Sequence, residues 1–253
     1  MTSLADRTCL ITGASSGLGT HFAKLLAGAG ARVVIAARRR ERIVALADEI
    51  NTAGGSALAV EMDVTSEGST IAAFDAAEAA FGLVDTVIAN AGVSSPGRAI
   101  DATEAALRGL FDTNVLGVYL TAREGARRLI AGGSRESGRG RMVLVGSIGG
   151  AIPITGEAAY CASKAAVATL GRNLAREWVR QGINVNVIQP GFILTEMASE
   201  WFASPGGEKQ IAGFHRKRLQ PISSLDQPML FLCSDAAAST TGAVMTIDDG
   251  QSL

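Results

Sequence analysis

Three side chains in the second half of the chain have the types and spacing needed for proton transfer at a carbonyl oxygen. Tyr160 and Lys164 are four residues apart, which places a phenol and an ammonium group on one face of a helix, and Ser147 lies thirteen residues before Tyr160. A phenol with a pKa of about 10 transfers protons poorly at neutral pH, but a neighbouring cation stabilises the phenolate. Taken alone, the pair is also typical of a packed tyrosine beside a solvated lysine.

A glycine-rich turn near the N-terminus could bind phosphate groups. The apolar run 7–12 predicts a buried strand, and the apolar spacing in 21–26 predicts a helix. In a turn between them the backbone can approach a pyrophosphate, and the helix N-terminus favours an anion. The G-x-x-x-G-x-G spacing differs from the common G-x-G-x-x-G fingerprint, so a tight strand-to-helix connection remains the alternative. The expected contacts are Gly13, Ser15, Ser16, Gly17, Leu18 and Gly19.

The elements that must position these groups alternate between strands and helices. This alternation favours an α/β fold with a parallel sheet, right-handed crossovers and ligands at the carboxyl ends of the strands. Strands are expected near 7–12, 32–37, 57–62, 84–89, 141–146, 183–188 and 244–247. The main helices are expected at 38–51, 66–81, 104–131, 157–180 and 226–234, with a polar loop at 132–140.

Composition restricts the class of protein. The 253 residues contain no linker-like segment, so a single domain over 1–253 is expected. A net charge of −1 gives no reason to expect nucleic acid or an anionic membrane as a partner. No apolar run is long enough to span a membrane and no charged leader precedes one, which predicts a cytoplasmic protein. Three scattered cysteines predict core packing rather than disulfides or a metal site.

Several short motifs together resemble the short-chain dehydrogenase/reductase family in its standard-length form, over essentially the whole chain. The motifs are Thr12-Gly13-x-x-x-Gly17-x-Gly19, Asn90-Ala91-Gly92, Asn114, Ser147, Tyr160-x-x-x-Lys164 and Pro190-Gly191. The resemblance implies a Rossmann-type domain with a seven-stranded parallel sheet and a nicotinamide cofactor. It also implies a homotetramer, assembled through the helices at 104–131 and 157–180.

The same resemblance assigns catalytic roles. Ser147 and Tyr160 hold the substrate oxygen, and Tyr160 gives or takes its proton. Lys164 lowers the pKa of Tyr160 and binds the nicotinamide ribose. Asn114 holds a water that links Lys164 to solvent; the alternative is a structural amide bonded within its own helix.

The end of the second strand indicates which cofactor is used. No carboxylate is present there to bind the ribose 2′-hydroxyl of NAD, and an arginine fork suits a 2′-phosphate. NADP(H) is therefore preferred, with Arg38 the leading contact and Arg39 the second. A basic first turn on a solvated helix is the alternative. Ser16 stands where some NADPH-preferring relatives have a basic residue, so NAD(H) stays possible.

Further cofactor contacts follow from the resemblance alone. They are Asp63 and Val64 at the adenine, Asn90, Ala91 and Gly92 near the adenine ribose, Pro190, Gly191 and Ile193 at the nicotinamide carboxamide, and Thr195 near the pyrophosphate. Asp63 has an alternative role as the cap of the next helix. Asp249 stands where the family pattern has glycine, which leaves the form of that turn open.

The substrate pocket is expected beneath a variable lid at about 194–219. Small and apolar residues dominate its predicted walls, which favours neutral, hydrophobic or bulky ketones and their secondary alcohols. The walls are Ser94, Ile148, Gly149, Pro153, Ile154, Glu157, Met197, Trp201 and Phe202. The basic run 215–218 is expected to be a solvated helix face.

Two other functions remain open. The first is reduction of 3-oxoacyl groups on acyl carrier protein, which needs a cationic docking surface, with Arg127, Arg128 and Arg176 as candidates. The second is a non-catalytic nucleotide-binding scaffold. The presence of all four expected catalytic residues argues against it.

Overall fold

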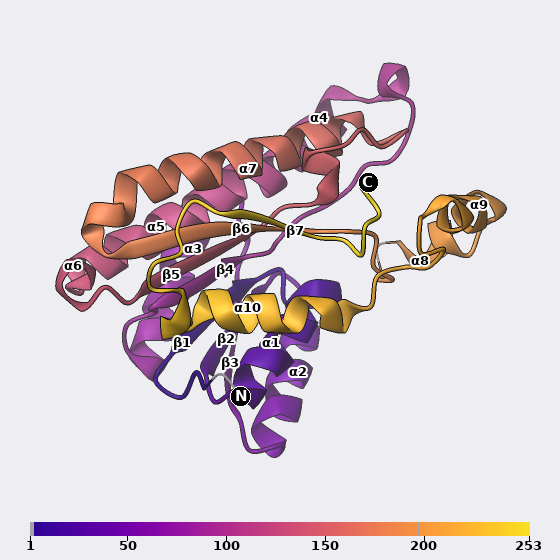
Figure 1. The fold of residues 1–253 in the computed structure, drawn as a ribbon. Coiled ribbons are helices and arrows are strands. Elements are labelled where there is room, and N and C mark those ends of the chain that lie inside the picture. The colour runs from indigo at the N-terminus through magenta and orange to yellow at the C-terminus, as the bar shows by residue number, and fades with distance from the viewer. Residues whose placement is uncertain (1–2, 197) are drawn as a thin grey trace.

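A seven-stranded sheet forms the centre of the computed structural model, which describes residues 3–196 and 198–253. Every strand pair is parallel and the strand order is β3-β2-β1-β4-β5-β6-β7, which confirms the expected α/β class (Figure 1). The order reverses between β1 and β4, so the carboxyl ends of these two strands form the switch point where ligands of such sheets bind. The strands are β1 (Thr8–Thr12), β2 (Arg32–Ala37), β3 (Ser56–Glu61), β4 (Thr86–Ala89), β5 (Gly140–Val145), β6 (Ile183–Pro190) and β7 (Val244–Ile247).

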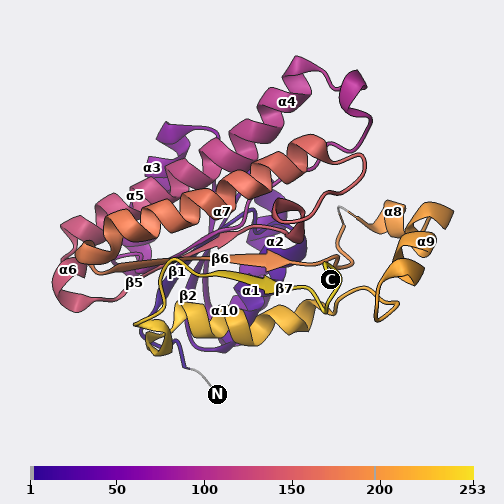
Figure 2. The same cartoon turned by 45° about the horizontal axis from the view of Figure 1, so that its top comes forward.

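Helices cover both faces of the sheet (Figure 2). One face packs against α1 (Gly17–Gly28), α2 (Arg40–Thr52) and α10 (Asp226–Cys233). The other packs against α3 (Glu67–Phe81), α5 (Gly117–Ala131) and α7 (Ala158–Trp178). Because both faces are covered, β1 is apolar at successive positions, with Leu10 in one core and Ile11 in the other.

The cysteines are all free thiols. Cys9 and Cys233 are buried in the core beneath α1 and α10, as core packing predicts. Cys161 is half-buried on α7, next to Tyr160.

The single helix expected over 104–131 is wrong in one respect. The structure has α4 (Glu104–Phe111), a π-helical segment η2 (Asp112–Leu116) and then α5. Asn114 lies within η2, and the irregular turn carries its side chain into the buried interior. The loop expected at 132–140 contains one further helical turn, α6 (Ser134–Ser137).

The lid contains two short helices, α8 (Ser199–Phe202) and α9 (Pro205–Gly213), which project from the body of the fold (Figures 1 and 2). Ser204 accepts a hydrogen bond from Gly207 N and caps α9, while Pro205 fits the first helical turn. Short 3₁₀ turns complete the structure: η1 (Ala99–Asp101), η3 (Ile148–Gly150), η4 (Val179–Gln181), η5 (Ile222–Leu225) and η6 (Asp235–Ala237). Among the described residues, no helix is both long and apolar enough to cross a membrane.

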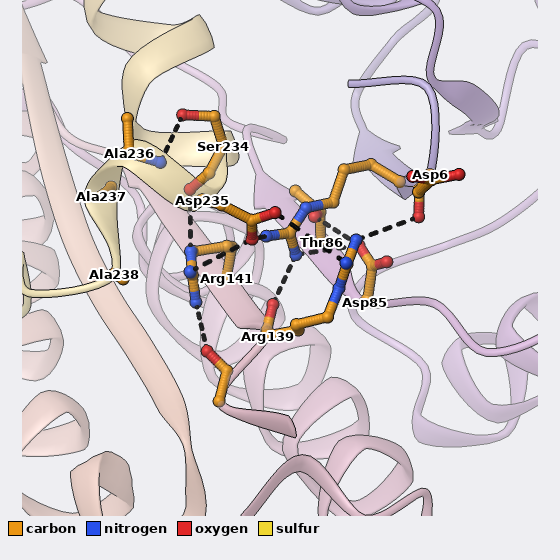
Figure 3. Close-up of polar contacts among 12 residues, drawn as sticks. Asp6, Asp85, Thr86, Arg139, Arg141, Ser234, Asp235, Ala236, Ala237 and Ala238 are labelled. Carbon is orange, nitrogen blue, oxygen red and sulfur yellow. Dashed lines mark hydrogen bonds and ion pairs between the residues drawn. The ribbon is translucent and has the colours of Figure 1, made fainter. Parts of the chain in front are cut away.

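An arginine cluster with two buried members, Arg7 and Arg141, ties the amino ends of three strands to the turn after α10 (Figure 3). We define the cluster as Arg7, Asp85, Arg139, Arg141 and Asp235. Arg7 is 2% exposed; it pairs with Asp85 at 3.5 Å and with Asp235, and it donates to the Arg139 carbonyl. The cluster therefore lies at the end of the sheet opposite the glycine-rich turn.

Candidate active site

The structure brings Ser147, Tyr160 and Lys164 together beyond the carboxyl end of β5. Ser147 begins the η3 turn, where its hydroxyl accepts a hydrogen bond from Gly149 N at 3.1 Å. Tyr160 and Lys164 are one turn apart on α7, and the Lys164 Nζ lies 5.6 Å from the centre of the Tyr160 ring. Lys164 is buried and donates to the Val145 carbonyl at 2.9 Å, which fixes its ammonium group at the strand end.

Burial governs the protonation of this group. It raises the pKa of Tyr160, the Ser147 side chain lowers that pKa, and the Glu157 carboxylate raises it. Burial also lowers the pKa of Lys164 to about 8, so the amine stays largely protonated at neutral pH. The effect of Lys164 on the pKa of Tyr160 stays a prediction, and its ammonium group lies over the tyrosine ring.

Asn114 connects three elements at the edge of this site. Its Oδ1 accepts from Val93 N at 2.8 Å, and its Nδ2 donates to Val93 O at 2.9 Å and to Ser163 Oγ at 3.0 Å. Ser163 in turn donates to the Tyr160 carbonyl at 2.7 Å. The amide therefore bonds to the loop after β4 and to α7, so bonding within its own helix was the wrong alternative. Sequence reasoning missed Ser163, although a hydroxyl between Tyr160 and Lys164 on one helix was the available signal.

Gly92 separates Asn114 from Lys164. A Cβ built on Gly92 would lie 3.3 Å from Lys164 Nζ and 3.5 Å from Asn114 Oδ1. The predicted catalytic residues thus border one small space, and any larger side chain at position 92 would intrude on it.

Close backbone approach explains two glycines of the N-terminal turn. Gly13 has φ +65°, and a Cβ there would lie 2.7 Å from Ala91 Cα. A Cβ on Gly19 would lie 2.7 Å from the Asn90 side-chain nitrogen. The turn is thus pressed against the loop after β4, with its backbone N–H groups at the start of α1, as a pyrophosphate site requires. Ser16 is the N-cap residue of α1.

Thr12 holds the two sides of the switch point together, a role that sequence reasoning did not assign. Thr12 is 1% exposed. Its hydroxyl oxygen accepts hydrogen bonds from Asn90 N and Ala91 N, both at 3.0 Å. The Asn90 side chain donates back to Thr12 O at 2.8 Å. A hydroxyl residue at the end of a buried strand was the signal for it.

Arg39, rather than Arg38, contacts the glycine-rich turn. Its guanidinium donates to Ser15 Oγ at 2.9 Å and to Ser16 Oγ at 2.5 Å. Arg38 is exposed and lies close enough to Asp63 to lower the pKa of that carboxyl, after the larger effect of the Thr65 hydrogen bonds. Both arginines thus border the expected adenosine site, from different sides.

Glu196 links the start of the lid to this basic region, and the sequence pattern did not point to it. Arg42 donates to both Glu196 oxygens, at 3.0 and 2.8 Å, and Arg39 lies 3.7 Å from the same carboxylate. Thr195 lies beside the glycine-rich turn, since a Cβ on Gly17 would be 3.6 Å from its Cβ. These contacts hold the first lid residues next to the glycine-rich turn.

The residues expected at the adenine are in place with different side-chain roles. The Asp63 carboxylate accepts from Thr65 N at 3.0 Å and from the Thr65 hydroxyl at 2.8 Å. Ser66 is the residue that caps α3, so the capping alternative for Asp63 is wrong. Val64 is buried against Gly117, which leaves its backbone as the part that can face a ligand.

Pro190 ends β6, as expected, and Gly191 follows in a crowded position. A Cβ on Gly191 would lie 2.9 Å from Asp248 Cα, so the turn after β6 requires glycine against the C-terminal segment. Ile193 is 6% exposed and packs in the core beneath α1 and α10.

The expected pocket walls divide into those near Ser147 and those away from it. A Cβ on Gly149 would lie 3.5 Å from Ser147 Oγ and 3.0 Å from the end of the Ile154 side chain, so both residues border the catalytic hydroxyl. The side chain of Ile148 is 1% exposed and packs in the interior. Pro153 is exposed.

The contacts of the lid aromatic residues are with Gln210 on α9 and with Phe192 before the lid. Trp201 is 53% exposed and donates to Gln210 on α9 at 2.7 Å. Phe202 is buried edge-on against Phe192, with ring centres 5.9 Å apart. Their assignment as pocket walls stays a prediction. Met197 lies outside the described residues.

Asp249 fixes the base of the lid and settles the form of the last turn. It adopts φ +57°, a conformation that glycine takes more easily, and accepts from Arg218 at 2.8 Å and pairs with Arg216 at 3.0 Å. The basic run follows α9, which ends at Gly213, so its assignment to a solvated helix face is wrong. Charge pairing with Asp249 holds it to the C-terminal segment.

We expect Asp249→Asn to loosen this attachment without straining the turn, because Asn tolerates the left-handed conformation. Trypsin cleavage after Arg216, Lys217 or Arg218, followed by mass spectrometry, should become about two- to fivefold faster. Asp101→Asn, which removes another exposed ion pair, is the control. Equal cleavage rates in all three proteins would show that Asp249 does not hold the lid.

A family comparison identifies the fold. The model of the short chain dehydrogenase family matches residues 7–206. The chain belongs to the short-chain dehydrogenase/reductase family. As a member it is an oxidoreductase of the class that interconverts alcohols and ketones, with a fold that binds NAD or NADP.

Three relatives span nearly the whole of this short-chain dehydrogenase. Cis-4-hydroxycyclohexanecarboxylate dehydrogenase of Sinomonas cyclohexanicum is 36% identical over 255 residues, covering 98% of this chain and 97% of the relative. A gluconate 5-dehydrogenase from Burkholderia cenocepacia, solved with NADP and tartrate, is 28% identical with a TM-score of 0.92, covering 99% and 96% of the two chains. A 3-ketoacyl-(acyl-carrier-protein) reductase from Brucella melitensis, complexed with NADH, is 32% identical with a TM-score of 0.89, covering 99% and 100%.

Proposed function

We propose that the protein is an NADP(H)-dependent reductase of neutral, hydrophobic or bulky ketones, and a dehydrogenase of the matching secondary alcohols. The observation that carries this proposal is the meeting of Ser147, Tyr160 and Lys164 beside the glycine-rich turn, at the carboxyl end of the sheet. In this proposal the single domain over 1–253 binds the cofactor, and its lid at about 194–219 covers the substrate.

The residues present fit a nicotinamide dinucleotide. Gly13 and Gly19 leave no room for side chains where the turn meets the loop after β4, so backbone groups face the expected pyrophosphate. Gly92 leaves the Lys164 amine accessible from the same loop. The bound nicotinamide supplies or accepts a hydride at the carbon that carries the substrate oxygen.

The chain supplies the proton and stabilises the charge on oxygen. In the reductive direction, negative charge develops on the substrate oxygen, Tyr160 gives that oxygen its hydroxyl proton, and the Ser147 hydroxyl donates a hydrogen bond. Lys164 then faces the phenolate as a fixed cation, because its amine is held at the Val145 carbonyl. In oxidation the proton returns to Tyr160. Asn114 is proposed to hold a water on the path from Lys164 to solvent.

The preference for NADP(H) rests on the arginines after β2. Arg39 and Arg38 provide cationic donors at the strand end, where no carboxylate is present. Glu196 opposes them in part, since its carboxylate is 3.7 Å from Arg39, so use of NAD(H) at a lower rate is also proposed. Relatives with NADP and with NADH are both among those described above.

Initial rates of NADPH and NADH oxidation, measured with small, aryl and bulky ketones and a 3-oxoacyl thioester, test this function. We expect fastest turnover of bulky ketones with NADPH. Arg39→Ala should lower kcat/KM for NADPH by about tenfold or more and leave that for NADH within about threefold, because a charge-assisted hydrogen bond to phosphate is lost. Arg32→Ala, at the far end of β2, is the control. A wild-type preference for NADH would contradict the cofactor assignment.

Reduction of 3-oxoacyl groups on acyl carrier protein is the second candidate, favoured by the similarity to the Brucella melitensis reductase. One candidate docking residue is less suited to this role. The guanidinium of Arg128 already forms ion pairs at 2.7 to 2.9 Å, with Glu124, Glu78 and Asp75. Arg127 and Arg176 are exposed. Selective turnover of the thioester would support this candidate.

We also propose a homotetramer formed through the helices around α5 and α7. Large apolar side chains are exposed on α4, η2 and α5 and border a hollow against α7. Phe111, Leu116 and Tyr119 line this hollow, and Leu107 is a further exposed apolar side chain on α4. Light scattering at micromolar concentration should give a mass well above that of one chain. The cytoplasmic location stays a prediction from the sequence.

A further inference from the structure

Glu157 is a carboxylate with one hydrogen-bond partner beside the catalytic tyrosine. It is half-buried, and the Ser94 hydroxyl lies 2.7 Å from its Oε1 and 2.8 Å from its Oε2. Burial raises the pKa of Glu157 and the Ser94 hydrogen bond lowers it; within residues 3–196 and 198–253 no cation contributes. The carboxyl group therefore has no positive partner there.

The position of Glu157 is fixed by the backbone on both sides. It precedes the first residue of α7, its carbonyl accepts from Cys161 N at 2.8 Å, and its N–H donates to Ile154 O at 3.1 Å. The neighbouring Gly156 carbonyl accepts from Gly97 N at 2.9 Å, which joins this loop to the loop that carries Ser94. The carboxylate is close enough to raise the pKa of Tyr160 by its charge. Glu157 is the N-cap residue of α7, three residues before Tyr160, so the two side chains start from the same turn of the chain, beside a substrate held by Tyr160.

The hydrogen-bonding capacity of this pair is incompletely used. An ionised carboxylate has about four acceptor positions and no donor, whereas Ser94 has a single hydroxyl proton to give. That one proton is shared between the two oxygens. The remaining lone pairs can accept from a ligand, and an acceptor-only charged group favours a donor and repels an anion.

We propose that Glu157, supported by Ser94, accepts a hydrogen bond from a hydroxyl group next to the reacting carbonyl, so that hydroxyketones and the matching diols are preferred substrates. This inference rests on the proposed ketone reductase function and narrows its substrate class. A bulky apolar ketone remains a substrate, and the adjacent hydroxyl adds selectivity. Ketones with a carboxylate in the same position are disfavoured.

The test compares an α-hydroxy aryl ketone with its α-methoxy counterpart, which keeps the oxygen but cannot donate. Wild-type enzyme should reduce the hydroxy compound with a kcat/KM at least about tenfold higher. In Glu157→Gln that ratio should fall to within about threefold of unity, because the charged acceptor is gone. Glu177→Gln, the same change at an exposed position of α7, should keep the wild-type ratio.

The outcomes separate this inference from the function on which it rests. If neither ketone is reduced with NADPH or NADH, the proposed function fails. If both are reduced with equal kcat/KM by the wild type, or if Glu157→Gln keeps the wild-type ratio, the hydroxyl site is overturned and Glu157 is only a tether between two loops.

A pH profile gives a second readout, which reports the charge of Glu157 near the phenol. The charge of Glu157 raises the pKa of Tyr160, so its removal should move the midpoint of alcohol oxidation to lower pH, with Ser147, Cys161 and Lys164 unchanged around the phenol. A shifted midpoint together with a lost substrate ratio supports the proposal. A shifted midpoint with an intact ratio overturns it and leaves Glu157 as an electrostatic neighbour of Tyr160.

Discussion

Replacing Tyr160 by Phe should lower kcat by about 10³-fold, since general acid–base catalysis by a positioned side chain contributes roughly 10² to 10⁴. Phe keeps the ring that faces Lys164 and removes only the hydroxyl, so the packing of α7 and the position of the amine should persist. NADPH binding, followed by fluorescence, should stay within about threefold of wild type. Loss of rate with retained binding would locate the defect in proton transfer.

The chain provides its own control for this experiment. Its sequence contains two tyrosines, and the other, Tyr119, is 41% exposed on α5. Tyr119→Phe removes the same hydroxyl outside the catalytic group and should retain near wild-type kcat. A Tyr160→Phe enzyme that keeps more than about a tenth of wild-type turnover would falsify the catalytic assignment. Wild-type protein that binds NADPH but reduces no carbonyl compound would instead favour the scaffold alternative.

Arg7→Met should produce the largest loss of stability, about 3 kcal/mol or more in the free energy of unfolding. Methionine fills much of the same space but leaves Asp85 without its buried cation, and burial already raises the pKa of that carboxyl.

The loss should depend on pH. A raised pKa in the folded state means that the folded protein binds the Asp85 proton more tightly, so its stability falls as pH rises from the ordinary pKa of the carboxyl to the raised one. The deficit of the Arg7→Met variant should therefore shrink when the pH is lowered into the acidic range. Urea unfolding at fixed protein concentration, repeated at several pH values, measures both effects.

Arg139→Met is the matched control within the arginine cluster. Arg139 is 39% exposed at its side chain and lies 3.9 Å from Asp235, so its removal should cost less than about 1 kcal/mol. If Arg7→Met costs no more than Arg139→Met, the cluster does not contribute to stability through buried charge pairing.

The sequence predicted the sheet well because its signals are local. Buried strands such as β1 and β2 carry short apolar runs, and the turns after β1 and β6 carry glycine or proline. The π-helical segment η2 was not predicted, because the residue that Asn114 contacts, Val93, is distant in the sequence. The spacing of apolar residues in a helix also does not reveal one inserted residue.

The candidate site was predicted residue by residue, but the contacts between its parts were not. Which of two adjacent arginines faces the glycine-rich turn depends on the helix start at Arg40, and the structure selects Arg39. Glu196 meets Arg42 across 154 positions of sequence, a distance at which no spacing pattern applies. The contacts of Trp201 with Gln210 and of Phe202 with Phe192 were not predicted, because a side chain in a lid packs on the protein as readily as on a substrate.

The burial of two of the three cysteines has a practical consequence for labelling. Burial raises the pKa of Cys9 well above its usual value and that of Cys233 to about 12, so neither thiol supplies much thiolate to a reagent. Cys161 is half-buried and adjoins Tyr160 in the chain. A thiol-directed fluorophore or spin probe would therefore report from the edge of the catalytic group in the native sequence, without an engineered attachment point.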